Sequence, residues 1–517
     1  MFLIMRGKKK ILAAVVATAV IGSAAGCGAS SSDNTIEESE KKTASFDYEA
    51  PVQTPNILVD QKGFLPDSDK VAVFRGKEIP TTFTVNRIED GTPAFEGVIL
   101  KETYDEELGE SYALGYFTDL VEEGSYYICA DYLGESYSFS IAETTVSDTF
   151  YEACKKFYYN RCGIALSENY AGESGHSACH TNAARLQEDE SIQIDVTGGW
   201  HMDEQADRDT NVGSKIAENF LLAYEMDEEA FTDELGIPES GNGIPDILDE
   251  VRYEVEWLIK MQDDKTGGEY GAALTDSSKG GDVINYPVVV TPVSMEATIN
   301  FAATLARFSY FYQQYDAEFA TTCLRAADKA WNCYRVNQNI DDDPLAFKAA
   351  TQLYRATGSD AYKDVINAFF TKSDFDELFN SNEDVFIGSV TYLSTSQAVD
   401  VDQCGKLMKC LMKRSGEIAD KSSKNTYLVS DLESEEGFLN LLYDMRCLTI
   451  TDHIIYNHEY TTIIENHLHY LMGMNPDAMN YVTDSTERTY QDEAGKAGIL
   501  NDPRNNALLI FMLSVLK

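Results

Sequence analysis

The hydrophobic pattern of the chain changes once, near Ser147. Before this residue, from Asn56 to Ile141, short apolar runs alternate with polar residues at a period of two, and glycine and proline separate them. After it, apolar residues recur at three-to-four spacing as far as the C-terminus. Because strands present side chains with a period of two and helices with a period of 3.6, the two regions belong to different fold classes. The sequence predicts a small all-β sandwich at 55–145, followed by a large, mainly α domain at 146–517.

The expected helices are recognised by their three-to-four spacing, and Pro245 falls near the first turn of one of them, where its missing N–H costs nothing. No short repeat accompanies them, which argues against a solenoid. They cover residues 215–224, 247–261, 297–315, 322–334, 346–357, 438–448 and 460–472.

The N-terminal residues have the composition of an export signal. Basic residues from Arg6 to Lys10 precede an apolar stretch, 11–21, that is too short to span a bilayer comfortably. Ala24, Ala25 and Gly26 then lead to Cys27, an order similar to the lipobox of bacterial lipoproteins. We therefore expect a lipoprotein signal peptide at 1–27, with Cys27 lipidated.

The polar segment that follows, 28–54, has too few apolar residues to fold and is expected to be a disordered tether. Together these features predict a protein on the extracellular face of a bacterial cell membrane, held there through its lipid. The alternative is an ordinary cleaved signal followed by a disordered start.

The net charge limits the partners. The chain has 86 Asp and Glu against 41 Lys and Arg, a formal charge of −45. Such a surface repels phosphate backbones and anionic lipid headgroups, so nucleic acid and polybasic membrane binding are excluded and a neutral or cationic ligand is favoured. Apart from Cys27 there are nine cysteines, an odd number without the density of a disulfide scaffold, and most are expected to be buried free thiols.

Several strings resemble glycoside hydrolase family 9, the cellulase family, in its subgroup with an N-terminal immunoglobulin-like domain. The resemblance implies an (α/α)6 barrel after an immunoglobulin-like sandwich, and an inverting hydrolase acting on β-glucans. The matching strings are ILVDQKGFLP at 57–66, FYYNRCG at 157–163, CHT at 179–181, DVTGGWH at 195–201, IPESGNGIPDILDE at 237–250, LYRATG at 353–358 and YLMGMNP at 470–476.

Two thiols and two imidazoles, from Cys162, Cys179, His180 and His201, make a closed set for a tetrahedral, structural Zn²⁺. The resemblance places the zinc of the subgroup at these residues. Their spacing alone also fits two buried cysteines beside surface histidines. Calcium could bind acidic clusters such as Asp341–Asp343 and 239–249, but neither has the ligand spacing of a dedicated loop, and solvated acidic faces are expected instead.

The catalytic strings depart from the family. Where the resemblance implies two aspartates after Gly-Gly-Trp-His, ungapped counting places Met202 and Gln205, and neither side chain can act as a base. Asp203, Glu204 or Asp207 would have to substitute.

The general acid is missing as well. Leu500 falls on the position of the family's glutamate, and Asp502 or Glu493 are the stand-ins. No histidine follows His469, so the sugar-gripping His-His-Arg loop is absent. Core packing is the better explanation for two of the three tryptophans, Trp257 and Trp331.

Three hypotheses remain. The first is a cell-surface family member that binds a β-glucan or related glycan and has lost the usual hydrolysis, or keeps little of it. The second is an active inverting β-1,4-glycosidase with rebuilt carboxylates. The third is a scaffold that binds a secreted protein, because fold alone does not determine function.

Overall fold

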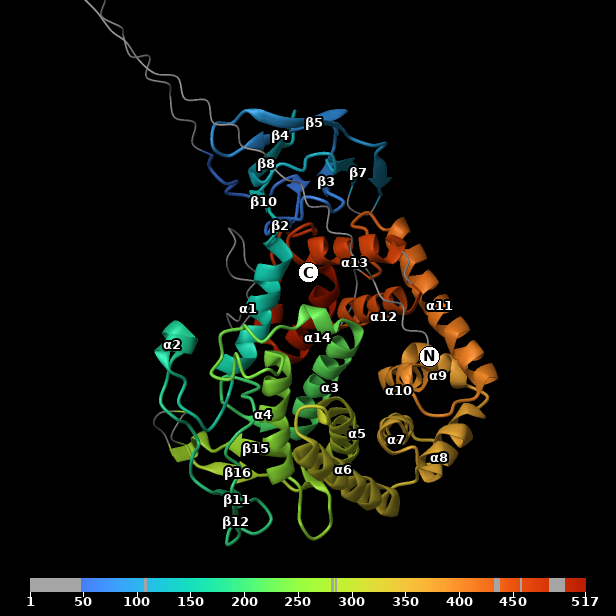
Figure 1. Ribbon diagram of the computed structural model, residues 1–517. Helices are drawn as coiled ribbons and strands as arrows, with labels where there is room; N and C mark the ends of the chain where they lie inside the picture. The colour runs from blue at the N-terminus through green and yellow to red at the C-terminus, as the bar shows by residue number, and fades with distance from the viewer. Residues whose placement is uncertain are drawn as a thin grey trace, which may run out of the picture. The chain divides into compact units, whose positions relative to one another are not determined.

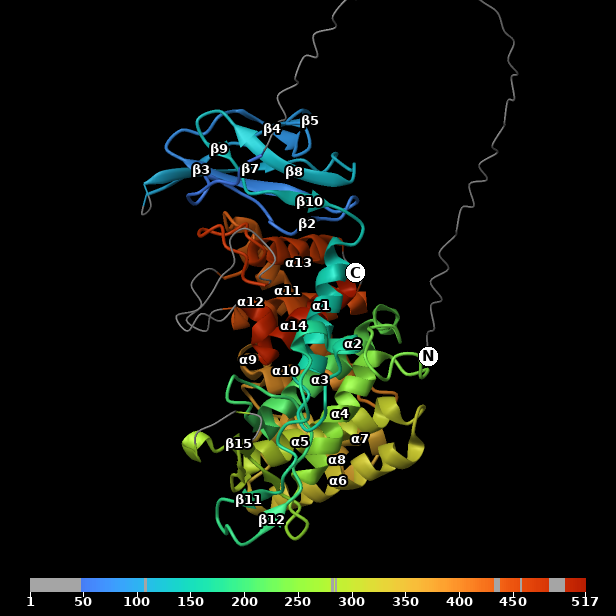
Figure 2. The ribbon, with the colours of Figure 1, turned by 90° about the vertical axis from the view of Figure 1, so that its left-hand side faces the viewer.

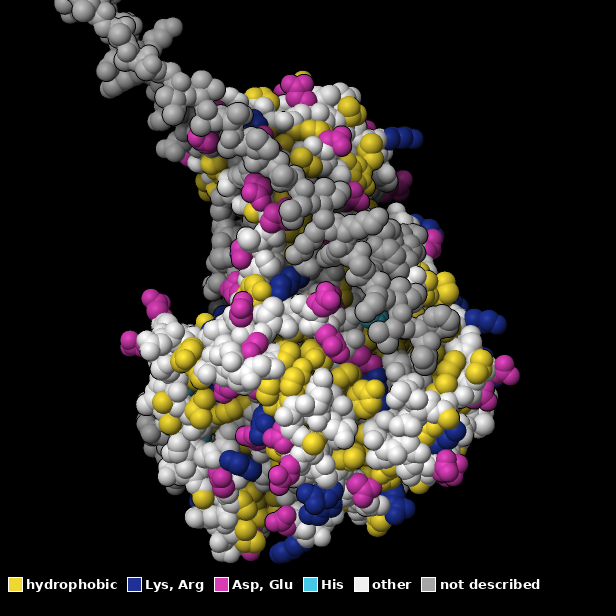
Figure 3. Space-filling view, viewed as in Figure 1, with side chains coloured by type: hydrophobic (Ala, Val, Ile, Leu, Met, Phe, Trp, Pro, Cys, Tyr) yellow, Lys and Arg dark blue, Asp and Glu magenta, His cyan; other side chains and the backbone are white. Residues whose placement is uncertain are grey.

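The structure, a computed structural model, describes residues 48–106, 109–279, 283, 286–431, 438–455, 458–482 and 498–517. Cys27, the tether up to residue 47 and Glu493 lie outside the described residues. Among those described, no helix is both long and apolar enough to cross a membrane. In Figure 3, acidic side chains are interspersed with basic ones over the visible face and do not form one patch.

The N-terminal region is a sandwich of two β-sheets, as predicted (Figure 1). Buried side chains such as Phe74, Val85 and Ile128 fill the space between the sheets. One sheet has the order β1 (Ile57–Leu58), β3 (Val71–Gly76), β7 (Glu110–Tyr116) and β6 (Thr103–Asp105). The other has the order β2 (Gly63–Phe64), β10 (Phe139–Ile141), β8 (Gly124–Ala130), β4 (Thr82–Arg87) and β5 (Pro93–Val98), and β9 (Gly134–Glu135) pairs with β8.

Twelve of the helices that follow alternate between an outer and an inner position, which is the (α/α)6 arrangement. Consecutive inner helices pack against one another from α12 through α14, α3, α5 and α7 to α10, and a hydrogen bond from Arg446 to Glu383 links α12 to α10. The helix α14 lies beside α3 in both views (Figure 1, Figure 2). The inner helices are α3 (Thr210–Met226), α5 (Met295–Tyr312), α7 (Pro344–Thr357), α10 (Glu383–Ser394), α12 (Leu439–Ile455) and α14 (Pro503–Leu516). The outer helices are α1 (Thr145–Tyr159), α4 (Asp246–Lys260), α6 (Ala317–Asn337), α8 (Asp360–Phe370), α11 (Val401–Lys424) and α13 (His458–Leu471).

Every helix expected from the sequence is present, with boundaries that differ by a few residues. The sequence did not predict the short strands between the helices, because runs of two to four residues have no detectable periodicity. They are β11 (Ala184–Leu186), β12 (Gln193–Ile194), β13 (Arg208–Asp209), β14 (Glu269–Tyr270), β15 (Ala272–Thr275), β16 (Val288–Val290) and β17 (Val293–Ser294). The helices α2 (Glu168–Ala171) and α9 (Phe375–Ser381) are similarly short.

Because inner and outer helices alternate in direction, the N-terminal ends of all six inner helices lie at one end of the barrel. Capping side chains mark this end: those of Asp209, Ser294, Asp343, Asn382 and Asp502 each accept hydrogen bonds from backbone N–H groups of the helix they precede.

At the opposite end, the last turns of α3, α5 and α7 meet through charged side chains. Arg307 donates to Glu225 at 2.7 Å, and Arg355 donates to the same carboxylate. Burial raises the pKa of Glu225, but the two guanidinium groups outweigh it and hold the pKa at about 2. Two buried arginines against one carboxylate are tolerated because the C-terminal ends of helices carry partial negative charge.

Hydrogen bonds connect the sandwich to the end of α13 and to the residues that follow it. Asp60 contacts His469 at 2.8 Å, and Gln61 donates its backbone N–H to the carbonyl of Met472 at 3.0 Å and its side-chain amide to that of Ala478. Asp60 and His469 are both buried. The YLMGMNP string therefore contacts the turn between β1 and β2.

Gly63 provides a test of this fold. Its φ is +125°, and a Cβ there would collide with the backbone carbonyl oxygen of Ser140 in the neighbouring strand β10. Because that neighbour is backbone and cannot rotate away, we expect Gly63→Ala to lower the free energy of unfolding by more than about 3 kcal/mol.

The matched control is Gly134→Ala. Gly134 also has a positive φ, +84°, but a Cβ there would meet no atom within 4 Å. We expect a loss of about 1 kcal/mol, from backbone strain alone. Equal losses in urea denaturation of the two variants would contradict the collision.

Candidate functional site

The four residues predicted to bind metal lie together, and all but His201 are buried. The sulfur atoms of Cys162 and Cys179 are 3.7 Å apart, Cys162 Sγ is 3.5 Å from His180 Nδ1, and Cys179 Sγ is 3.6 Å from His201 Nε2. A tetrahedral Zn²⁺ with bonds of about 2.3 Å to sulfur and 2.05 Å to nitrogen separates its ligand atoms by roughly 3.4–3.8 Å. The donor set and its spacing therefore fit that ion.

The backbone around this cluster is constrained. His180 has a φ of +45°, unusual for a side chain with a Cβ, and the backbone N–H of Gly163 donates to Cys179 Sγ at 3.3 Å. Contact with the Cys162 thiol holds the pKa of the Cys179 thiol well below its usual range, although burial opposes this. A thiolate at Cys179 is the form that binds metal.

The loop that carries His201 is held between α1 and α4. His201 donates its backbone N–H to the carbonyl of Asn160 at 2.8 Å. Trp200, wholly buried, donates its backbone N–H to Glu254 at 2.9 Å and its indole N–H to Glu250 at 3.3 Å. The two glutamates are one helical turn apart on α4, so they accept hydrogen bonds from the loop at two points.

Glu254 is wholly buried, and burial raises the pKa of its carboxyl to about 8. The Trp200 backbone N–H and the charge of Arg208 oppose this shift but are weaker. Burial therefore favours the protonated form of this carboxyl, and in either form it can accept the Trp200 backbone N–H.

The loop from Met202 to Arg208 turns back on itself at the position of the expected catalytic base. Met202 packs against the hydrophobic core, and its backbone N–H donates to the carbonyl of Asp207 at 2.8 Å. Asp203, Glu204 and Gln205 are exposed. The Asp203 carboxylate accepts the backbone N–H of Asp207 at 3.0 Å and so closes the turn.

Asp207 is half-buried, and its carboxylate accepts the backbone N–H of Thr275 at 2.6 Å. Burial raises the pKa of Asp207 above its usual value, while the Thr275 N–H opposes the shift. The hydrogen bond ties the 202–208 loop to β15.

Asp502 caps α14. Its carboxylate accepts the backbone N–H groups of Arg504 and Asn505 and forms an ion pair with Arg504 at 2.8 Å. Burial alone would raise the pKa of Asp502, but these bonds outweigh it and lower the pKa. Leu500, at the position of the family's glutamate, is buried. Glu493 lies outside the described residues.

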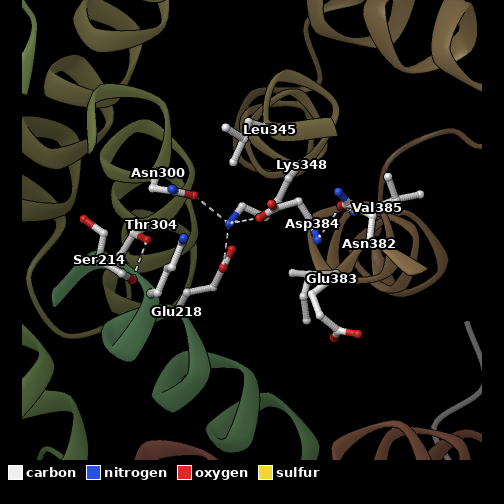
Figure 4. Close-up of polar contacts among 12 residues, drawn as sticks. Ser214, Glu218, Asn300, Thr304, Leu345, Lys348, Asn382, Glu383, Asp384 and Val385 are labelled. Carbon is white, nitrogen blue, oxygen red and sulfur yellow. Dashed lines mark hydrogen bonds and ion pairs between the residues drawn. The ribbon is translucent and has the colours of Figure 1, made fainter. Parts of the chain in front are cut away.

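The barrel axis holds a charged network that the sequence did not predict (Figure 4). Lys348 of α7 is buried, and its ammonium contacts Glu218 of α3 at 3.0 Å, Asn300 of α5 at 2.7 Å and Asp384 of α10 at 2.8 Å. Burial alone would raise the pKa of Asp384, but the Lys348 ammonium keeps it below its usual value. Its only sequence signal is one charged or amide residue among the apolar positions of each of the four helices, and the pattern of a single helix does not show which residues pair.

Beside this network, a polar pocket of about 380 Å³ opens between α10, α11 and α12. Arg414 and Arg446 both donate to Glu383 on its wall. Its lining is mainly amide, hydroxyl and charged groups, from Asn380, Glu383, Arg414, Lys421, Ser430, Asp431, Asn440, Tyr443 and Asp444.

The remaining predicted features have structural roles. The three tryptophans, Trp200, Trp257 and Trp331, are all buried. The cysteines among the described residues are free thiols, mostly buried. Asp342 pairs with Lys372, and Asp343 caps α7. Within the described part of the chain, the Cys/His cluster is the one group of three or more potential ligands close enough to hold a metal ion.

The chain is similar to known proteins in both of its regions. A model of glycosyl hydrolase family 9 matches residues 147–494, and a model of the cellulase N-terminal Ig-like domain matches residues 52–135. The Cellodextrinase of Butyrivibrio fibrisolvens is 27% identical over 487 residues, covering 84% of this chain and 86% of that protein.

Endoglucanase D of Acetivibrio thermocellus is 27% identical over 340 residues, or 64% of this chain and 50% of the relative. This chain thus spans about half the length of that protein.

Among solved structures, a metagenome-derived family 9 endoglucanase superposes with a TM-score of 0.77 at 22% identity, covering 89% of this chain and 98% of the other. A structure described as a Zn-binding triple mutant of a family 9 endoglucanase superposes with a TM-score of 0.74 at 21% identity, covering 87% and 99%. At these identities the superpositions show the shared fold.

Removing the buried ammonium tests the axial network. Lys348→Met leaves the Asp384 and Glu218 carboxylates without their cation, so we expect it to lower the free energy of unfolding by about 3–5 kcal/mol at pH 8. In the wild type, the depressed pKa of Asp384 contributes stability that is present at neutral pH and is lost as the pH falls through it.

In the variant, acid protonates the unpaired carboxylates, so the difference from wild type should narrow between pH 8 and pH 5 in urea denaturation. The control is Lys215→Met, which removes the exposed pair with Glu296 and should cost no more than about 1 kcal/mol. A loss for Lys348→Met that does not change with pH would contradict the ion-pair account.

Proposed function

Because the chain belongs to glycosyl hydrolase family 9, we propose that it binds a β-glucan or related polysaccharide at the N-terminal end of its barrel, with the family's inverting hydrolysis lost or strongly reduced. One observation carries the second half of the proposal: Met202 occupies the expected base position, and three of the four described stand-ins for the catalytic carboxylates already form structural hydrogen bonds, whereas the fourth, Glu204, is exposed. Asp203 closes a turn, Asp207 ties that turn to β15, and Asp502 caps α14.

An inverting glycosidase needs a carboxylate base that holds water and an acid on the other side of the glycosidic oxygen, roughly 6.5–9.5 Å away. At the expected base position Met202 is packed against the core, and the neighbouring Asp203 points back into its own loop. The expected base position itself therefore offers no carboxylate that could hold a water molecule.

The acid position fails for a different reason. A general acid must be protonated at the working pH, which requires a raised pKa. Asp502 has a lowered pKa because of its bonds with Arg504 and the helix N-terminus, so it is ionised and cannot donate a proton.

The polar pocket supports glycan binding. Its amide, carboxylate and guanidinium groups match the hydroxyl groups of a sugar, which both donate and accept hydrogen bonds. Arg414 and Arg446 are fixed by Glu383, so the wall is ordered before any ligand arrives.

One observation favours a second candidate, an active glycosidase with rebuilt carboxylates. Asp207 is half-buried and its pKa is raised, which makes its carboxylate a stronger base than an exposed aspartate. For this candidate, Asp203, Glu204 or Asp207 would serve as the base, and Asp502 or Glu493 as the acid.

We further propose that the Cys/His cluster holds a structural Zn²⁺. Cys162, Cys179, His180 and His201 supply four donors and leave no position for substrate, so the ion would fasten the Trp200 loop to the end of α1 and take no part in chemistry. Display on the cell surface through a lipid on Cys27 is likewise a proposal, supported by the small residues that precede this cysteine.

Turnover and binding measured together test the main proposal. The wild type should migrate more slowly in native gels that contain a neutral β-glucan than in gels without it. It should release no more reducing sugar from the glucan than a protein-free blank does. An Asn380→Ala, Lys421→Ala double variant, which removes two groups from the polar pocket, should bind about tenfold more weakly.

The variant Asp203→Asn, Asp207→Asn keeps the shape of both side chains and should bind as the wild type does. Sugar release by the wild type that disappears in this variant would overturn the loss of hydrolysis and establish the second candidate.

Metal analysis tests the zinc site. We expect about one Zn²⁺ per purified chain, and we expect Cys179→Ser, His180→Ala to lose both the ion and several degrees of thermal stability. Cys404→Ser, which changes a partly exposed thiol outside the cluster, should retain the metal. Zinc that persists in the double variant would refute this ligand set.

A further inference from the structure

A second groove lies outside the barrel end, along the outer helix α1. It has a volume of about 360 Å³ and is formed by Tyr151, Glu152, Lys155 and Tyr159 of α1, with Glu234 and Leu235 from the loop before α4. None of these residues belongs to the metal cluster, the polar pocket or the capped helix ends. Their chemistry is aromatic and acidic.

The two tyrosines are arranged along the groove. They are eight residues apart on one helix, which separates them by about 12 Å along its axis and by roughly 80° around it. Lys155 falls between them. Tyr151 is 36% exposed and Tyr159 is half-buried, so their rings are anchored at one side and open at the other. Lys517 lies 4.4 Å from the centre of the Tyr151 ring and helps to hold it.

Lys155 forms part of the wall and is not a free charge. Its ammonium donates to the carbonyl oxygens of Leu235, at 3.4 Å, and Gly236, and it lies 5.2 Å from the centre of the Tyr158 ring. The lysine therefore joins α1 to the loop before α4 and fixes the two walls of the groove relative to each other.

The carboxylates determine which ligands fit. Within the described part of the chain, neither Glu152 nor Glu234 has a side-chain hydrogen bond or ion pair, so both are available as acceptors. With Lys155 they leave one net negative charge, which disfavours phosphates and other anions. Open aromatic rings beside free acceptors suit a ring-shaped ligand with an apolar face and hydroxyl donors at its edge.

From this geometry we propose that the α1 groove is a second saccharide-binding site, which takes a short stretch of neutral oligosaccharide stacked on Tyr151 and Tyr159. The ligand class is that of the proposed function, but the site is separate from the barrel end. Because all three tryptophans are buried, tyrosines are the larger aromatic side chains left to stack on sugars. Two sites on one chain would raise the affinity for a polymer above that of either site.

The test counts the bound oligosaccharides. With the full mature chain and cellotetraose as the probe, isothermal titration should give two sites for the wild type and one for Tyr151→Ala, Tyr159→Ala. The Asn380→Ala, Lys421→Ala variant should keep the α1 site. Affinity for hydroxyethyl cellulose in native gels should fall at least tenfold in the tyrosine variant. The control, Tyr104→Ala, removes a tyrosine that is 62% exposed in the sandwich and should change neither value.

Thermal unfolding of each variant shows that it is folded, and Glu234→Ala, on an exposed loop, is a second variant that should also weaken the α1 site. Two sites retained in a folded Tyr151→Ala, Tyr159→Ala variant would overturn the α1 groove and leave the barrel-end proposal intact. One site in the wild type, lost with the tyrosines and kept without Asn380 and Lys421, would support the groove and overturn the barrel end. An equal loss of affinity in Tyr104→Ala would overturn the proposed saccharide site in the α1 groove. The absence of any oligosaccharide binding by the wild type would also overturn it.

Discussion

A single buried ammonium, that of Lys348, connects four of the six inner helices. It reaches Glu218, Asn300 and Asp384 from α7, so any shift of α3, α5, α7 or α10 along the barrel axis would separate charges in a medium of low polarity. Apolar packing alone allows helices to slide by small amounts at little cost. The ion network therefore fixes the relative height of these helices, and with it the positions of the capped N-terminal ends that form the proposed glycan site.

Charges are distributed along the barrel as the helix dipoles require. The end where the inner helices begin carries the acidic caps and Asp384, whereas the end where they finish carries Arg307 and Arg355 around one carboxylate. Acidic groups at the first end are stabilised by the helices themselves. At Asp502, the bonds with Arg504 and with the helix N-terminus lower the pKa, and raising it for acid catalysis would require apolar surroundings.

The sequence predicted the fold well and the site only in part. The periodicity of a helix such as α5 is visible in its own sequence. The Cys/His cluster was predicted through the family resemblance, because its spacing alone also fitted two buried cysteines beside surface histidines. The Lys348 network could not be predicted, because it pairs residues 36 to 130 positions apart, and a lone charge on an apolar face reveals nothing about its partner. The short strands β11–β17 were missed because pairing, not local pattern, defines them. Hydrogen bonds formed by Asp203 and Asp207 likewise depend on a loop conformation that spacing does not specify.

The packing of Met202 has a consequence for any attempt to place a base at this position. Its side chain packs on the hydrophobic core, and its backbone is closed into the turn that Asp203 and Asp207 complete. Returning an aspartate to this position would place a carboxylate against apolar neighbours, and the turn would also have to open before that carboxylate could reach a water molecule. Under the proposed function, restoring a base here would therefore take more than one substitution, because the apolar neighbours and the turn would both have to change in the same loop.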